Sequence, residues 1–258
     1  MLKIASWNVN SLKMRLDQVL SWIETTEVDV LALQETKTID PNFPLQVFQT
    51  LGFHVAYSGQ PSYNGMAIIS RTPLHDIVTD IPEFLDPQRR ILAVTVNNMR
   101  VINLYVPNGS TVNSEKYIYK LNWLEQVTQY IQDEMKKYAH VVVVGDFNIA
   151  PNDCDVHDPE EWIGSVLVSP AERAALKNIL DLGFHDSFRQ LNPTDPQYSW
   201  WDYRAASYRR NRGLRIDLIL LNQNLMTKCV ESSIDSGPRQ HAQPSDHAPV
   251  LVSLQMES

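Results

Sequence analysis

The sequence predicts a single α/β domain in which helices pack outside mixed β-sheets. Short runs rich in β-branched residues, bounded by Asn, Pro or Gly, recur along the chain and are typical of strands. Between some of these runs lie segments whose apolar residues recur every three or four positions, as in amphipathic helices. The sequence contains no Gly/Ser-rich linker, no repeat of about 20 to 50 residues and no low-complexity tract, so we expect residues 1–258 to form one domain.

Nine segments have the composition and boundaries expected of strands. They cover residues 2–7, 28–34, 53–57, 66–70, 91–96, 100–105, 141–145, 216–221 and 249–254. The fifth and sixth are separated by little more than Asn97 and Asn98, residues that tolerate the left-handed backbone of a tight hairpin. We therefore expect these two strands to pair antiparallel.

Apolar residues recur at helical spacing in three further segments. The segments contain Leu16, Val19, Leu20 and Ile23; Leu121, Leu124, Thr128, Ile131 and Met135; and Leu176, Ile179 and Leu180. The third helix has the clearest start, since Ser169 can cap it, Pro170 suits its first position and Glu172 completes a capping box. Gly183 is expected to end it.

The composition indicates a folded, acidic protein. Of the 258 residues, 43% are hydrophobic and 20% are charged, which excludes intrinsic disorder. Asp and Glu number 30 against 22 Lys and Arg, so the formal net charge is -8. Phosphate binding normally shows as a basic balance, so the global charge alone argues against a nucleic-acid partner.

The sequence shows no sign of secretion or membrane insertion. Cys154 and Cys229 lie far apart, which excludes a disulfide framework and most structural zinc sites and favours a reducing compartment. The N-terminus has no basic region followed by an apolar one, and the longest apolar run, residues 141–144, is too short to span a bilayer. We expect a cytoplasmic monomer with no membrane partner.

Polar side chains gather at the ends of the predicted strands. Those after the early strands are Asn8, Asn10, Glu35, Tyr105, Asn108, Asp146 and Asn148, and those at the start of the last two strands are Asp217, Asp246 and His247. If the late strands run antiparallel to the early ones, all these groups reach the same rim. One Asp or Asn at a strand end is most often a turn former or helix cap, so it is their convergence that favours a site.

The chemistry of this set favours a hard divalent cation. Its oxygen donors are the side chains of Glu35, Asp146, Asp217, Asp246, Asn8 and Asn148. Such ligands suit Mg²⁺ or Mn²⁺, whereas the seven His include neither an HExxH motif nor a close pair that would suggest a zinc hydrolase. The GxSxG, GxGxxG and P-loop motifs are also missing. These observations favour metal-assisted attack of water on a phosphate ester.

At these residues the sequence resembles the exonuclease III-type apurinic/apyrimidinic endonucleases of the endonuclease/exonuclease/phosphatase superfamily. The matching segments, in family order, are SWNVNSL (6–12), LQETK (33–37), NGMA (64–67), QRRI (88–91), YVPNG (105–109), GDFNIAP (145–151), WWDYR (200–204), NRGLRID (211–217) and PSDHAP (244–249). They cover essentially the whole chain. The resemblance implies a DNase I-like fold, a four-layered α/β sandwich of two mixed sheets packed face to face with helices outside.

The resemblance also implies a metal site for Mg²⁺, with Mn²⁺ as an alternative. Glu35 and Asn8 would hold the metal directly, and Asp246 would act through water. Asp146 would contribute to this site and activate or orient the attacking water, helped by Asn148. Some animal members of the family have Asp at the position of Asn10, which leaves the role of that residue open.

Further matching residues are implied to bind the substrate. His247, oriented by Asp217, would hold the phosphate and stabilise its developing charge, and such a pairing would favour the imidazolium. The phosphate would also contact Tyr105, Asn108 and Arg90. The pocket for a flipped abasic sugar would be lined by Trp200, Leu214 and Ile216.

One segment, residues 198–217, is basic although the protein is acidic. It has five Arg against two Asp, a net charge of +3, with two Trp and three Tyr interleaved. This composition is typical of surfaces that grip phosphates and stack on bases or sugars. We expect DNA-backbone contacts from Arg204, Arg209, Arg210 and Arg212. For Trp201 and Tyr203, packing into the core is at least as good an interpretation.

The acidic residues 153–161 are expected to form a solvated loop. They comprise Asp153, Asp155, Asp158, Glu160 and Glu161. A run of charges is usually a solvated surface, so we assign these residues, and Cys154 among them, no role in the site.

The resemblance, in agreement with these patterns, implies a Mg²⁺-dependent DNA repair phosphodiesterase of base excision repair. It would cleave double-stranded DNA 5′ to abasic sites after flipping the sugar, and process 3′ ends as a 3′ to 5′ exonuclease and 3′ phosphatase. In a bacterium it would be associated with the nucleoid. Two alternatives remain open: a sibling phosphodiesterase acting on another phosphate ester, and a nucleic-acid-binding regulator that has lost catalysis.

Overall fold

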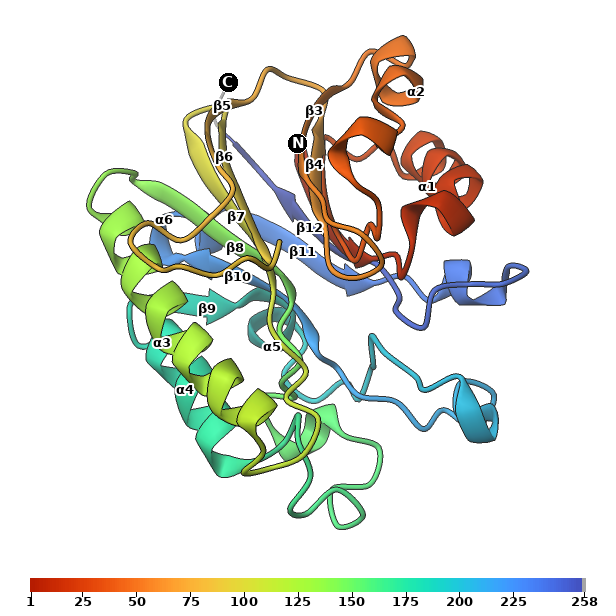
Figure 1. The fold of residues 1–258 in the computed structure, drawn as a ribbon, viewed down its shortest axis with the longest axis vertical. Coiled ribbons are helices and arrows are strands. Elements are labelled where there is room, and N and C mark those ends of the chain that lie inside the picture. The colour runs from red at the N-terminus through yellow and green to blue at the C-terminus, as the bar shows by residue number, and fades with distance from the viewer. Residues whose placement is uncertain (257–258) are drawn as a thin grey trace.

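Two six-stranded sheets face each other at the centre of the molecule, and helices cover their outer faces (Figure 1). The computed structural model describes residues 1–256. In spatial order the first sheet contains β11 (Cys229–Ile234), β12 (Val250–Leu254), β1 (Leu2–Asn8), β2 (Val30–Gln34), β4 (Met66–Ser70) and β3 (His54–Ser58). The second contains β5 (His75–Val78), β6 (Ile91–Val96), β7 (Met99–Tyr105), β8 (His140–Asp146), β10 (Asp217–Asn222) and β9 (Phe184–Asp186).

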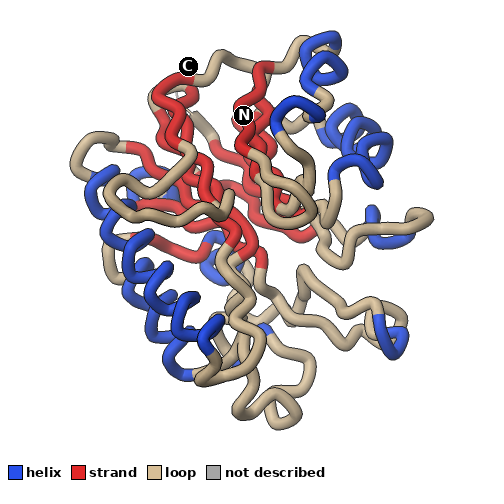
Figure 2. The backbone as a smooth tube through the Cα atoms, in the orientation of Figure 1, coloured by secondary structure: helices blue, strands red, loops and turns tan. Residues whose placement is uncertain are grey.

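Helices flank this pair of sheets on two sides, as the tube in Figure 2 shows. The α-helices are α1 (Leu12–Thr26), α2 (Leu45–Thr50), α3 (Glu115–Met135), α4 (Pro170–Leu180), α5 (Ser187–Leu191) and α6 (Gln223–Met226). Single 3₁₀ turns occur at η1 (Asp40–Asn42), η2 (Asp153–Asp155), η3 (Arg204–Ala206) and η4 (Gly237–Gln240). Helices α1 and α2 pack on the first sheet, and α3 and α4 pack on the second. The predicted four-layered sandwich is therefore confirmed.

Strand β8 illustrates why the central strands are continuously apolar. Val141 and Val143 point to the layer shared with α3 and α4, whereas Val142 and Val144 point to the opposite sheet. Successive side chains of a strand alternate between its two faces, and here both faces are covered. The layer between the sheets also contains Ile4 of β1 and Val252 of β12, so residues from both ends of the chain share one core.

All nine predicted strands are present, and both sheets are mixed as predicted. β1 and β2 pair in parallel, as do β7 and β8, and the other ladders are antiparallel. The hairpin of β6 and β7 turns at Asn97 and Asn98, whose φ angles of 48° and 58° lie in the left-handed region. Strands β5, β9 and β11 were missed because they are short or polar segments at or near sheet edges.

The predicted start of α4 is confirmed and its predicted end is wrong. Ser169 accepts a hydrogen bond from the Glu172 amide, Glu172 completes the capping box, and Pro170 is the first helical residue. The helix ends at Leu180 with Asp181 as its C-cap. Gly183, with φ 107°, lies in the following turn, where its amide donates to the Leu180 carbonyl.

The strand directions bring the polar strand ends together. β12 runs antiparallel to β1, and β10 runs antiparallel to β8 with Asp217 directly opposite Asp146. The ends of the early strands and the starts of the late strands therefore share one edge of the sandwich, as predicted. Long loops, residues 147–169 and 198–216, extend from this end of the molecule (Figure 1). Among residues 1–256, none of the helices has the length and apolar character needed to cross a membrane.

Candidate active site

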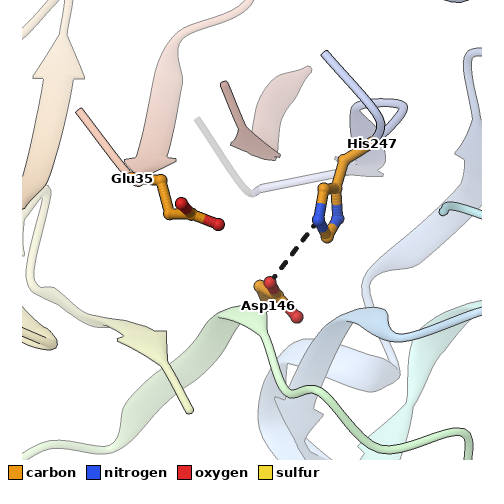
Figure 3. Close-up of side chains that lie close together, drawn as sticks. All are labelled: Glu35, Asp146 and His247. Carbon is orange, nitrogen blue, oxygen red and sulfur yellow. Dashed lines mark ion pairs between the residues drawn. The ribbon is translucent and has the colours of Figure 1, made fainter. Parts of the chain in front are cut away.

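The centre of the site is formed by two carboxylates and one imidazole. The closest potential ligand atoms of Glu35, Asp146 and His247 all lie within 4.8 Å of one another (Figure 3). Figure 3 shows the three side chains arriving from different segments and converging on a common space. Asn8 joins them, since its Nδ2 donates to Glu35 Oε1 and to Asp146 Oδ2, both at 2.9 Å. The structure thus brings these four predicted residues together.

Glu35 is held in place by its backbone. It follows β2 with a φ of 51°, a left-handed conformation that is strained for Glu. Its carbonyl accepts the Ser11 amide at 2.8 Å, and the Thr36 and Lys37 amides donate to the Gly65 and Asn64 carbonyls. A Cβ on Gly65 would lie 2.3 Å from Thr36 Oγ1, so only Gly fits there. The NGMA motif therefore fixes the segment that carries Glu35.

His247 is the most strongly oriented of these side chains. Its Nδ1 donates to Asp217 Oδ2 at 2.8 Å, and Ser199 Oγ donates to the same Asp217 oxygen at 2.7 Å. The opposite ring nitrogen, Nε2, lies 3.7 Å from Asp146 Oδ2 (Figure 3, dashed line). The predicted pairing of His247 with Asp217 is therefore present, and it aims Nε2 at the centre of the site.

The charge states of these groups follow from burial and from one another. Burial raises the pKa of Asp146 to about 7; His247 opposes the shift, whereas Asp217 and Glu35 add to it. Burial lowers the pKa of His247, but the carboxylates of Asp217 and Asp146 raise it by more, to about 10. At neutral pH His247 is therefore an imidazolium, and Asp146 is a base that can take up a proton.

Asn148 and Asn108 lie beside Asp146. The Asn148 amide donates to Asp146 Oδ1 at 2.9 Å, and its Nδ2 donates to the Val106 carbonyl at 2.9 Å. Asn148 has a φ of 48°, a conformation that Asn tolerates better than most residues. Asn108 Nδ2 in turn lies 3.4 Å from Asn148 Oδ1. Both predicted Asn residues thus belong to the same cluster as Asp146.

Tyr105 and Arg90 form the wall on the Glu35 side. The Arg90 guanidinium lies 4.7 Å from the centre of the Tyr105 ring, and its Nη1 donates to the Tyr105 carbonyl at 3.2 Å. Burial and the carboxylates of Glu35 and Asp146 raise the pKa of Tyr105 well above its ordinary value, so the hydroxyl stays protonated. A cavity of about 560 Å³ next to this wall is lined by Glu35, Arg90, Tyr105 and Asn108.

Asp246 connects to the centre through Asn10 and Lys37. Its carboxylate accepts Asn10 Nδ2 at 2.9 Å and Trp200 Nε1 at 3.0 Å. Asn10 Oδ1 accepts Lys37 Nζ at 2.5 Å, and Lys37 Nζ lies 3.0 Å from Glu35 Oε2. The structure thus gives Asn10 a place between Asp246 and Lys37. Lys37 lies in the LQETK motif but was not among the predicted site residues.

Trp200, Leu214 and Ile216 lie together at the side of the site. Leu214 and Ile216 are fully buried and Trp200 is partly exposed, its ring packing edge-on against Trp162 at a centroid distance of 6.5 Å. Trp162 was not singled out from the sequence, because nothing in its spacing sets it apart. These side chains form one apolar cluster, which its partly exposed member Trp200 connects to Asp246.

The basic segment divides into an exposed and a buried part. Arg204, Arg209, Arg210 and Arg212 are exposed, which leaves them available for a ligand. Arg204 pairs with Asp202 at 2.7 Å, and Arg212 lies 3.6 Å from Glu161. Trp201 is buried as predicted, whereas Tyr203 is half exposed and does not belong to the core.

One residue of the acidic run is not solvated, contrary to the prediction. Asp155 is fully buried and accepts Arg215 Nε at 2.7 Å and Arg189 Nη2 at 2.6 Å. Arg215, also fully buried, donates from Nη2 to Asp186 at 2.7 Å. Spacing along the chain could not reveal this network because Asp155 and Arg215 are 60 positions apart. The network anchors the loop that ends in Asp217.

The residues at the centre fit a divalent cation. The carboxylates of Glu35 and Asp217 both repel the buried carboxylate of Asp146, and this repulsion adds to burial in raising the pKa of Asp146. A bound cation would offset that repulsion, and carboxylate and amide oxygens are the donors that Mg²⁺ and Mn²⁺ prefer. Glu35 and Asp146 present the nearest carboxylates, with the Asn8 amide between them.

The four-layered sandwich and this rim of carboxylates, amides and a paired His together define a hydrolase of phosphate esters. The model of the Endonuclease/Exonuclease/phosphatase family matches residues 5–247. Exodeoxyribonuclease III of Haemophilus influenzae is 36% identical over 266 residues, which cover 98% of this chain and 100% of that protein. The chain belongs to the endonuclease/exonuclease/phosphatase family, as an exonuclease III-type apurinic/apyrimidinic endonuclease.

Solved structures agree with this assignment. A 3′ phosphatase, NExo, from Neisseria, bound to a product DNA hairpin, is 42% identical with a TM-score of 0.98, over 99% of this chain and 100% of that one. An AP endonuclease from Archaeoglobus fulgidus is 37% identical with a TM-score of 0.96, over the same shares of the two chains. The similarity covers both sheets and all the loops that carry the site.

Proposed function

We propose that the chain hydrolyses phosphodiester bonds in damaged double-stranded DNA during base excision repair. It would cut 5′ to abasic sites and remove phosphates, blocking groups and nucleotides from 3′ ends. The observation that carries the proposal is the position of Asp146, between the Asn8–Glu35 pair and the imidazolium of His247. The names of the relatives support the choice of DNA, since they include an exodeoxyribonuclease, a 3′ phosphatase and an AP endonuclease.

The side chains supply the groups that in-line hydrolysis requires. Asp146, with a pKa of about 7, would orient the attacking water and accept its proton. Asn148 would hold Asp146 through its amide. His247 would keep its Nδ1 proton on Asp217 and donate from Nε2 to a non-bridging phosphate oxygen, where negative charge develops.

We propose Mg²⁺ as the cation of the site, with Mn²⁺ able to replace it. Glu35 and Asn8 would hold it, with Asp146 and Asn148 at its side and Asp246 acting through water. The cation would neutralise charge on the phosphate and stabilise the leaving 3′ oxygen. Tyr105, Asn108 and Arg90 would bind the same phosphate from the opposite wall.

The apolar cluster of Trp200, Leu214 and Ile216 is proposed to receive the flipped abasic sugar. A sugar without a base presents C–H groups to a protein, and such groups would pack on the partly exposed Trp200 ring, which lies in the same apolar cluster as the buried Leu214 and Ile216. Since Trp200 donates to Asp246, this apolar cluster is coupled directly to the groups at the centre.

Removing the metal distinguishes a metal-dependent nuclease from a protein that only binds DNA. We expect EDTA to abolish cleavage of a synthetic abasic duplex and Mg²⁺ to restore it, whereas a regulator would bind the duplex tightly without cutting. In parallel, Mg²⁺ should raise the melting temperature of the metal-free protein, because a ligand that binds only the folded state stabilises it. Glu35→Gln should lose most of this shift, and the exposed Asp17→Asn variant should keep it. Cleavage that continues in EDTA would contradict the proposal.

Arg209, Arg210 and Arg212 are proposed to bind the DNA backbone. Replacing all three with Ala should weaken binding and lower the slope of log affinity against log salt concentration by about 2 to 3, because fewer counterions are released. A matched control replaces three other exposed cations, Lys136 and Lys137 just after α3 and Lys177 on α4. If both triple variants keep the wild-type salt slope in a fluorescence anisotropy titration, the Arg surface is not the DNA contact.

We further propose that residues 1–258 act as one domain and as a monomer, at the nucleoid of a bacterial cell. The family model matches residues 5–247, and the relatives at 36% and 34% identity are bacterial. Light scattering on the purified chain, alone and with duplex DNA, tests the monomer.

A further inference from the structure

The loops that carry Asn108 and Asn148 lie over one buried ammonium group. Lys120, on α3, is fully buried and forms an ion pair with Glu172 of α4, which is also fully buried. Its Nζ also donates to the Asn148 carbonyl at 2.7 Å and to the Asn108 carbonyl at 3.2 Å. The three protons of the ammonium therefore have three acceptors, from three separate segments of the chain.

Glu172 extends the same connection to a third loop. Its Oε1 accepts the Leu167 amide at 3.0 Å, and its Oε2 accepts the Ser169 amide at 3.1 Å and Ser169 Oγ at 2.6 Å. A capping Glu needs no buried cation for these bonds, since backbone and hydroxyl donors already satisfy it. The contacts of Lys120 with Asn108 and Asn148 are therefore additional to the cap.

Small shifts of the Asn108 and Asn148 carbonyls would also move groups at the centre of the site. Lys120 holds the Asn148 carbonyl, and the backbone amide of the same residue donates to Asp146 Oδ1. Asn108 Nδ2 faces Asn148 Oδ1. If the carbonyls lost their shared donor, both loops would relax, and Asp146 and the two Asn amides would leave their mutual alignment.

We infer that Lys120 is a positioning residue for catalysis: its ammonium holds the Asn108 and Asn148 backbones so that their side chains and Asp146 meet the reacting phosphate. The inference rests on the proposed function, since it concerns the same site. Lys120 itself is buried beneath the loops and does not touch the substrate. Misplacement of reacting groups by about 1 Å can lower a rate by about 100-fold, so the expected effect is on kcat.

A double variant that replaces both members of the ion pair separates an effect on catalytic positioning from an effect on stability. In the double variant Lys120→Met, Glu172→Gln both charges are gone and side-chain size is nearly kept, so the buried ion pair leaves no uncompensated charge. The control is Arg100→Met, which removes another buried cation and leaves its partner, Glu134 of α3, in place, so it disturbs stability at least as strongly. Arg100 lies on β7 away from the site, so its loss should reduce stability alone.

Steady-state kinetics with Mg²⁺ would use the duplex that wild type cleaves fastest among abasic, 3′-phosphate and recessed-end DNA. We expect the double variant to fold, to keep KM within threefold and to lose at least fivefold in kcat, while Arg100→Met keeps kcat within threefold. The inference is overturned if the double variant does not fold, loses less than fivefold in kcat or changes only KM. It is also overturned if Arg100→Met loses as much kcat as the double variant. Wild type that cleaves none of the duplexes would instead overturn the proposed function.

Discussion

Replacing Asp146 with Asn should lower kcat for DNA cleavage by about 10²- to 10⁴-fold, the range expected for loss of a catalytic base. An amide of the same size keeps the Oδ1 that accepts the Asn148 amide, but it cannot take a proton from water. The imidazolium of His247 and its bond to Asp217 should persist, so binding of DNA should be retained. Single-turnover cleavage and a binding titration on the same abasic duplex measure the two effects separately.

The matched control is Asp17→Asn on the exposed surface of α1. It removes the same charge without touching the site and should keep the wild-type rate. His247→Ala should also lose several orders of magnitude while remaining folded, because the phosphate would lose its charged donor. An Asp146→Asn enzyme that turns over within tenfold of wild type would show that another group activates the water.

Arg215→Met should reduce the free energy of unfolding by about 3 to 5 kcal/mol, the cost of breaking a buried ion pair by removing one partner. Arg215 is the shared partner of Asp155 and Asp186, and both carboxylates would lose their bonds to it. Burial raises the pKa of Asp155, but Arg215 and Arg189 lower it by more, so its pKa lies below the ordinary value. Urea unfolding at neutral pH measures the loss.

The pH dependence of the same variant gives a second check. Because the folded-state pKa of Asp155 is depressed, its pairing stabilises the protein at pH values above the unfolded-state pKa, and this part is lost as pH falls through the folded-state pKa. The difference between wild type and Arg215→Met should therefore shrink in acid. Arg210→Met, at an exposed position of the same segment, should change stability by less than about 0.5 kcal/mol. Equal losses for the two variants would contradict the role of the buried network.

The architecture could be predicted because its central strands are buried on both faces. Residues 141–145 form a continuous apolar run, and β8 indeed lies between a sheet and a helical layer. Strand β11 escaped prediction because it is a half-exposed edge strand whose sequence, CVESSI, is too polar to be distinctive. The local pattern of apolar residues indicates which elements are buried, so an element that is mostly exposed cannot be recognised from it.

The centre of the site could be predicted because strand ends concentrate polar residues at one rim. Glu35, Asp146 and His247 were selected on that ground and do converge. Lys120 could not be selected, since a Lys within an amphipathic helix normally lies in solvent, and only the folded structure shows it buried against Glu172. For the same reason Asp155 was assigned to a solvated loop: its partner, Arg215, becomes a neighbour only through long-range packing.

The pairing of β1 with β12 also determines when the catalytic centre can exist. Trp7 donates to the His247 carbonyl across 240 positions of the chain, and Asn8 and His247 reach Asp146 from opposite ends of the sequence. Contacts of such long range form after local ones, because loop closure costs entropy. During synthesis the centre stays incomplete until the segment containing His247 leaves the ribosome and β12 joins β1. A nascent chain that lacks His247 in place therefore cannot cleave DNA, and activity requires the completed fold.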